Sequence, residues 1–64
     1  MDGTVAEFDE PRGIGLIVSA DGQRFVFQCI EIADGTRDID VGQAVSFRLL
    51  PRFGAFQAGA IEKR

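Results

Sequence analysis

The chain contains no histidine, tryptophan or tyrosine and only one cysteine. Without histidine and with a single thiol it lacks the ligands of most zinc sites, and Cys29 has no partner for an internal disulfide. Cys29 also has no histidine to act as its base, so we interpret it as a small packed apolar residue. These absences predict a protein with no metal, no cofactor and no catalytic residue, which is therefore not an enzyme.

Long apolar runs are also absent. No stretch approaches the ~20 apolar residues of a membrane-spanning helix, and no basic leader with an apolar segment follows Met1. A lone thiol without partners is typical of a reducing compartment. We therefore expect a cytoplasmic protein with no membrane partner.

Positive charge is scarce, with seven Lys and Arg against ten Asp and Glu and a formal net charge of −3. Nucleic-acid binding draws much of its affinity from the neutralisation of phosphates. This balance disfavours tight binding, although a local group of arginines would still serve. The acidic segment with Asp34, Asp38 and Asp40 lacks the ligand spacing of a calcium loop, and we predict a solvated turn there.

The length of 64 residues allows one domain, residues 1–64, with one modest core. Turn-forming residues recur at short spacing, as at Asp21-Gly22 and Asp34-Gly35, which is typical of an all-β sandwich or barrel. A short helical turn is expected around residues 29–33. The expected strands span Gly3–Phe8, Gly13–Ser19, Arg24–Cys29, Ala44–Leu50 and Phe56–Glu62.

Alternation of apolar and polar residues assigns the faces of these strands. The outward residues of the second and third strands are Ile14, Leu16, Val26 and Gln28. A three-residue loop, Ala20-Asp21-Gly22, pairs Ile17 with Phe25 and keeps each pair on one face, so we prefer it to a two-residue loop. The predicted core consists of Val5, Ile17, Phe25, Phe27, Val45, Phe47, Leu49 and Ile61, closed at its ends by Ile32 and Ile39.

Several segments resemble the bacterial cold-shock family. Gly3-Thr4-Val5-Ala6-Glu7-Phe8 is similar to the family's opening strand, Gly-x-Val-Lys-Trp-Phe. Arg12-Gly13-Ile14-Gly15-Leu16-Ile17 is similar to the first nucleic-acid motif, Lys-Gly-Phe-Gly-Phe-Ile, and Phe25-Val26-Phe27-Gln28-Cys29 stands in place of the second, Val-Phe-Val-His-Phe. Val41-Gly42-Gln43-Ala44-Val45-Ser46-Phe47 resembles Glu-Gly-Gln-x-Val-x-Phe. The resemblance implies a single cold-shock-like domain folded as a five-stranded antiparallel OB-type β-barrel.

The same resemblance implies a module that binds single-stranded RNA or DNA, as an RNA chaperone or a regulator of gene expression. Members of the family stack bases on exposed aromatic side chains and hold the backbone with cations. Here the expected Trp is Glu7, and the aromatic and histidine positions of the two motifs are occupied by Ile14, Leu16, Val26, Gln28 and Cys29. Phe8 matches a Phe of the family, and Arg12 replaces its Lys with another cation. Because only these two positions are preserved, we expect weak or retuned binding.

The implied contacts are Phe8 against a base, Arg12 on a phosphate, and the outward residues Ile14, Leu16, Val26 and Gln28 beside them. Near the fourth turn, Arg52 and Phe56 (with Phe53) either form a second stacking place or pack at the barrel rim. The alternative function is a protein-interaction or self-associating module, with a protein partner or a second copy in a homodimer on the aliphatic face of Ile14, Leu16 and Val26. Cover of that face by loops or by the C-terminal residues is a third interpretation.

Overall fold

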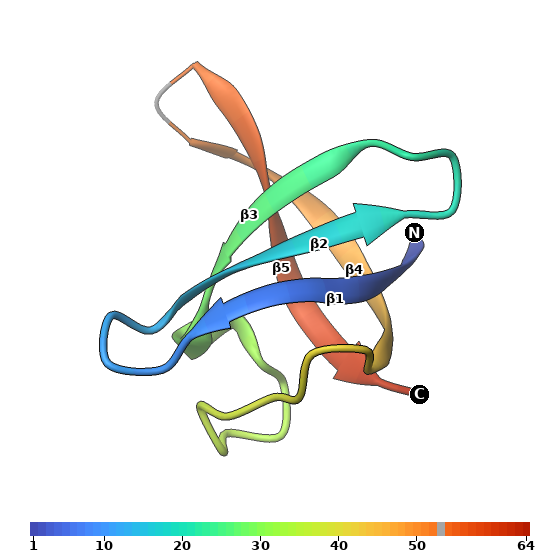
Figure 1. Cartoon of the computed structure of the whole chain (residues 1–64). Helices are drawn as coiled ribbons and strands as arrows, with labels where there is room; N and C mark the ends of the chain where they lie inside the picture. The colour runs from blue at the N-terminus through green and yellow to red at the C-terminus, as the bar shows by residue number, and fades with distance from the viewer. Residues whose placement is uncertain (53) are drawn as a thin grey trace.

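The computed structural model describes residues 1–52 and 54–64 and shows an all-β, OB-type barrel (Figure 1). Its strands are β1 (Asp2–Asp9), β2 (Ile14–Ser19), β3 (Arg24–Gln28), β4 (Ala44–Arg52) and β5 (Ala55–Lys63), and a 3-10 helix, η1 (Cys29–Glu31), follows β3. The helical turn predicted around residues 29–33 is thus confirmed. Among the described residues, no helix has the length and apolar character to cross a membrane.

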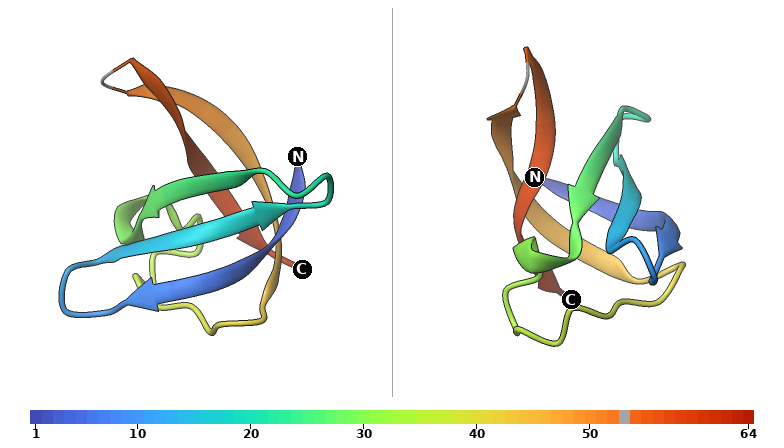
Figure 2. Two further views of the ribbon diagram at one scale, coloured as in Figure 1. Left: turned by 45° about the horizontal axis from the view of Figure 1, so that its top comes forward. Right: turned by 90° about the vertical axis from the view of Figure 1, so that its left-hand side faces the viewer.

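The strands close in the order β1-β2-β3-β5-β4. Neighbours are antiparallel except β3 and β5, which are parallel and meet through the pair Phe27 and Ala58. This corrects the expectation of a wholly antiparallel barrel, because the barrel closes between two strands that run in the same direction. Figure 2 shows the β1–β2–β3 meander on one side and the β4–β5 hairpin crossing it and extending beyond it.

The core contains the predicted residues with one exception. Val5, Ile17, Phe25, Phe27, Ile32, Ile39, Val45, Phe47 and Ile61 are all buried. Leu49 was predicted to face inward and is 37% exposed. It lies past an irregularity in the pairing of β4 with β5, in the half of β4 nearer the turn. Its cross-strand partner Ala58 is buried instead.

The predicted register of the β2–β3 hairpin is confirmed. The Ser19 amide donates to the Gln23 carbonyl at 2.8 Å and closes the three-residue loop, in which Gly22 has a φ of +88°. The buried Ser19 hydroxyl donates to the carboxylate of Asp21, which lowers the pKa of Asp21 below its usual value. The pairs are Ile17 with Phe25, Leu16 with Val26 and Ile14 with Gln28.

A bulge in β1 changes which residues face outward. Val5 pairs with Ile17 and Glu7 pairs with Leu16, so Ala6 is inserted between two successive pairs. The inserted residue shifts the alternation by one position. Glu7 therefore lies on the outward side with Leu16, and Phe8 lies on the inward side.

A second bulge lies in β5. Ser46 pairs with Glu62 but Arg48 pairs with Gly59, so β5 contains one residue more than β4 between these pairs. Ala60 has a φ of +48°, in the left-handed region that residues other than glycine rarely adopt. Its amide donates to the Glu31 carboxylate at 3.2 Å, which connects the bulge to η1.

We expect Ala60→Gly to raise the free energy of unfolding by about 0.5–1 kcal/mol. The left-handed conformation costs a residue with a Cβ about 1–2 kcal/mol, and the greater entropy loss of glycine offsets about 0.5–1 kcal/mol of that relief. Urea denaturation followed by circular dichroism measures the change. Ala44→Gly in β4, where φ is not positive, is the matched control and should lower stability. A less stable Ala60→Gly variant would contradict the strain at this bulge.

Candidate functional site

Two rows of side chains form the outward surface of the β1–β2–β3 meander. Cross-strand pairing places Glu7, Leu16 and Val26 in one row and Asp9, Ile14 and Gln28 in the next. The rows are two residues apart along each strand, about 7 Å. We call this surface, together with Arg12 at its end, the outer face. The structure thus brings together the predicted residues Ile14, Leu16, Val26 and Gln28.

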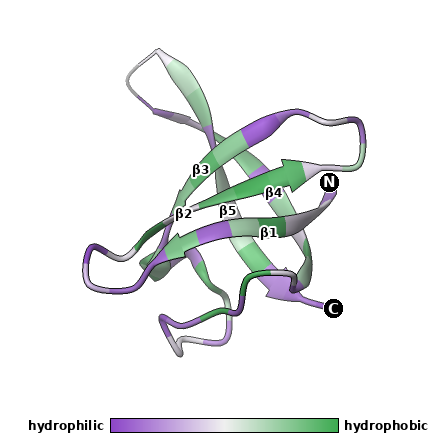
Figure 3. Ribbon diagram, viewed as in Figure 1, coloured by the Kyte–Doolittle hydropathy of each residue, from purple (hydrophilic) through white to green (hydrophobic). Residues whose placement is uncertain are grey.

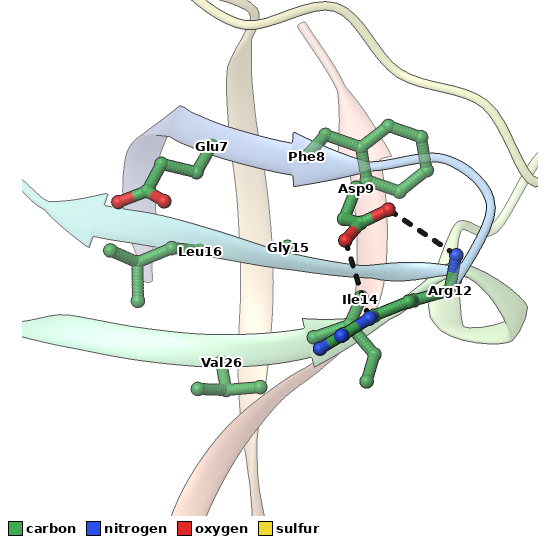
Figure 4. A pocket seen from close by; sticks show the side chains of 8 residues that line it. All are labelled: Glu7, Phe8, Asp9, Arg12, Ile14, Gly15, Leu16 and Val26. Carbon is green, nitrogen blue, oxygen red and sulfur yellow. Dashed lines mark hydrogen bonds and ion pairs between the residues drawn. The ribbon is translucent and has the colours of Figure 1, made fainter.

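A shallow hollow of about 410 Å³ lies on the outer face. Ile14 and Val26 keep 44% and 42% of their surface exposed beside it. Figure 3 shows that β2 is largely apolar and that β1 beside it is partly polar. The hollow therefore has an aliphatic floor and a charged rim. Its lining, drawn in Figure 4, consists of Glu7, Phe8, Asp9, Arg12, Ile14, Gly15, Leu16 and Val26.

Arg12 lies at the rim of the hollow and is paired with Asp9. Its Nε is 3.6 Å from Oδ2 of Asp9, and its backbone amide donates to Oδ1 at 3.4 Å. The two side chains are 79% and 51% exposed, and exposed pairs of this kind contribute little stability. A phosphate could therefore replace Asp9 at small cost, although the carboxylate beside the guanidinium also weakens its attraction for an anion.

Phe8 faces the core more than solvent. Its ring centroid is 5.9 Å from that of Phe27, with 5° between the ring planes. Gly15 pairs with Phe8, and a Cβ at Gly15 would meet the Phe27 ring and come within 2.7 Å of the Glu7 carbonyl. Only glycine leaves room for this packing. Since Phe27 covers one side of Phe8, at most its other side and edge are open to a base, and its stacking role stays a prediction.

Arg52 and Phe56 lie on the β4–β5 hairpin and do not line the hollow. Nη2 of Arg52 is 3.6 Å from Oε2 of Glu31, and Phe56, which pairs with Pro51, is 58% exposed. The structure therefore places these two residues apart from the other predicted contacts. Phe53, which we grouped with them, lies outside the described residues. A second stacking place on the hairpin stays a prediction.

The C-terminal residues do not cover the outer face. Lys63 pairs with Asp34 at 2.9 Å, and Arg64 pairs with Asp2. Neither of these cations lines the hollow. The part of our third interpretation that places the C-terminal residues over this face is therefore wrong, and cover by loops stays a prediction.

In the acidic segment, the Asp34 side chain bonds to the nearby Thr36 and to Lys63 of β5. The Asp34 carboxylate accepts the Thr36 amide at 3.0 Å and the Thr36 hydroxyl at 2.8 Å. The Thr36 amide, followed by Lys63, lowers the pKa of Asp34 to about 2. Over residues 1–52 and 54–64, no three His, Cys, Asp or Glu side chains are grouped so as to hold a metal ion. Cys29 is half-buried and packs against the core.

The outer face is thus an exposed aliphatic surface with an acidic side at Glu7 and a paired cation at Arg12. The arrangement can bind a flat or apolar group. The predicted contacts included most of its residues but neither Glu7, noted only as the replacement of the family's Trp, nor Asp9, whose side chain pairs with Arg12. Comparisons with known protein families and with curated proteins find no match for this chain.

Proposed function

We propose that the chain is a binding module of the cold-shock type that takes single-stranded RNA or DNA on its outer face, weakly and with a marked dependence on salt. It would act in the cytoplasm, without a cofactor and without catalysing a reaction. The observation that carries the proposal is the exposed surface of β1–β2–β3. On it, outward residues of the two segments that resemble the family's nucleic-acid motifs lie side by side, next to Arg12. A small OB-like barrel is compatible with this function.

Bases would lie on Ile14, Leu16 and Val26, and Arg12 would contact a phosphate. Aliphatic side chains give apolar contact but not the stacking worth roughly 1–3 kcal/mol per base that aromatic rings provide. Glu7 and Asp9 on the same face repel phosphates. Both effects point to low affinity.

Arg12→Glu should weaken binding of a uridine oligonucleotide about tenfold at low salt, because it replaces the rim cation with an anion. The slope of log affinity against log salt should become shallower by about one. Fluorescence anisotropy at several salt concentrations measures both quantities.

Arg37→Glu is the matched control, since it makes the same change of charge on a residue that does not line the hollow. It should alter affinity much less. Equal losses in the two variants would show that net charge, and not the outer face, controls binding.

A second candidate function is protein binding or self-association through the same face. The observation in its favour is the aliphatic cluster formed by the exposed residues Ile14 and Val26 and the half-buried Leu16. Contiguous apolar patches on small domains mark interaction surfaces. This function needs no cation, so the scarcity of free positive charge on the outer face does not count against it.

A further inference from the structure

Glu7 is the carboxylate that the outer face leaves free. The bulge at Ala6 turns it outward beside Leu16, and Figure 4 shows its carboxylate directed toward Leu16 and away from Arg12. Asp9, the other carboxylate on the rim, is occupied by Arg12. Over residues 1–52 and 54–64, the Glu7 carboxylate takes part in none of the side-chain hydrogen bonds or ion pairs.

A free carboxylate distinguishes bases because it only accepts hydrogen bonds. The Watson–Crick edge of guanine presents adjacent donors, N1–H and the N2 amino group, which match the two oxygens of a carboxylate. Adenine and cytosine present one amino group next to an acceptor nitrogen, and uracil presents one N–H between two carbonyls. On these three bases a carboxylate oxygen would meet an acceptor where guanine offers a donor.

The surroundings of Glu7 fit an unpaired base. Leu16 pairs with Glu7, and Val26 pairs with Leu16, so two aliphatic side chains continue the row from the carboxylate across the face. A base lying on Leu16 and Val26 would turn one edge toward Glu7. Single-stranded bases are commonly recognised through their Watson–Crick edges.

We propose that Glu7 makes the outer face select guanine in single-stranded nucleic acid; this inference rests on the function proposed above. The negative charge of Glu7 repels phosphates equally in every oligonucleotide, so it lowers all affinities together. Paired hydrogen bonds offset that repulsion for guanine alone. Glu7 thus sets specificity while reducing overall affinity.

The test uses uridine oligonucleotides of about seven residues, within the site size of an OB fold. One central residue is guanosine, inosine or uridine, and a single guanosine per strand prevents quadruplex formation. Inosine keeps the N1–H donor and lacks the N2 amino group. We expect the guanosine oligonucleotide to bind about fivefold or more tightly than the uridine one, as a bidentate base contact provides, with inosine between them.

Glu7→Gln separates the two effects of the carboxylate. It should raise affinity for the all-uridine oligonucleotide and bring the ratio of guanosine to uridine affinity close to one. Glu10→Gln is the matched control, because it removes the same charge from a residue that does not line the hollow. This control should keep the guanosine preference.

Each outcome decides a different question. Measurable binding with equal affinity for guanosine and uridine would overturn guanine selection and leave nucleic-acid binding standing. A guanosine preference that survives Glu7→Gln would overturn the role of Glu7. No binding of any of these oligonucleotides would overturn the proposed function and this inference together.

Discussion

Phe27→Ala is expected to lower the free energy of unfolding by about 3–5 kcal/mol. Phe27 is fully buried, its ring stacks on Phe8, and its backbone forms the pair with Ala58 that closes the barrel. Removing the ring would leave a cavity bordered by Gly15, which has no side chain to fill it. The free energy of unfolding of a domain of this size is small, so the variant should be largely unfolded at room temperature.

Phe56→Ala is the matched control, because it makes the same change at a side chain that is 58% exposed. We expect it to change stability by no more than about 0.5 kcal/mol. Phe27→Leu, a smaller loss of volume, should remain folded and lose about 1–1.5 kcal/mol, which keeps the measurement possible if the alanine variant does not fold. Urea denaturation gives all three values. A Phe27→Ala protein as stable as the Phe56→Ala protein would show that the core is not built around this ring.

The triple substitution Glu7→Trp, Leu16→Phe and Val26→Phe is expected to raise affinity for a uridine oligonucleotide about a hundredfold or more. These three residues are successive cross-strand neighbours in one row of the outer face. The substitution would therefore place three aromatic rings side by side. At roughly 1 kcal/mol or more per stacked base, three stacking contacts provide that gain.

Glu7→Gln alone is the control for the lost charge, and it should account for only a small part of the gain. Circular dichroism establishes that each variant is folded, and sedimentation shows whether self-association through the aliphatic cluster has changed. A folded triple variant with no gain in affinity would mean that the backbone of the outer face does not suit nucleic acid. Loss of self-association in the same variant would then favour the protein-interaction function.

Strict alternation and turn chemistry made the β2–β3 hairpin predictable. Ile17, Phe25 and Phe27 are inward as their spacing requires, and the loop that ends in Gly22 has the predicted length. The bulges were not predictable, because Ala6 and Ala60 are ordinary residues for a strand. At its positive φ, the Ala60 amide donates to the carboxylate of Glu31, which is distant in sequence. The prediction for Leu49 was wrong for a related reason, since alternation within one strand does not show where its pairing with the next strand becomes irregular.

The candidate site was predictable in its position and only partly in its details. Ile14, Leu16, Val26 and Gln28 lie where the alternation of β2 and β3 puts them. Phe8 lines the hollow beside the outward residues as expected, but the inserted residue at Ala6 also turns its ring toward Phe27 and the core. Whether Arg52 and Phe56 belong to the site depends on how the β4–β5 hairpin is directed in space, which local pattern does not encode.

The joint between β3 and β5, where the barrel closes, has fewer backbone pairs than any other contact between neighbouring strands. One backbone pair connects the two strands, and an isolated pair of Ile32 with Ile61 lies beyond it. Proteins open locally in cooperative units that often coincide with supersecondary motifs such as the β1–β2–β3 meander. The outer face belongs wholly to the β1–β2–β3 meander, so opening of the joint would expose core side chains without dismantling the face. Outward and core side chains alternate along β2 and β3. Substitutions on the outer face can therefore change which ligand it binds while the core residues between them stay the same.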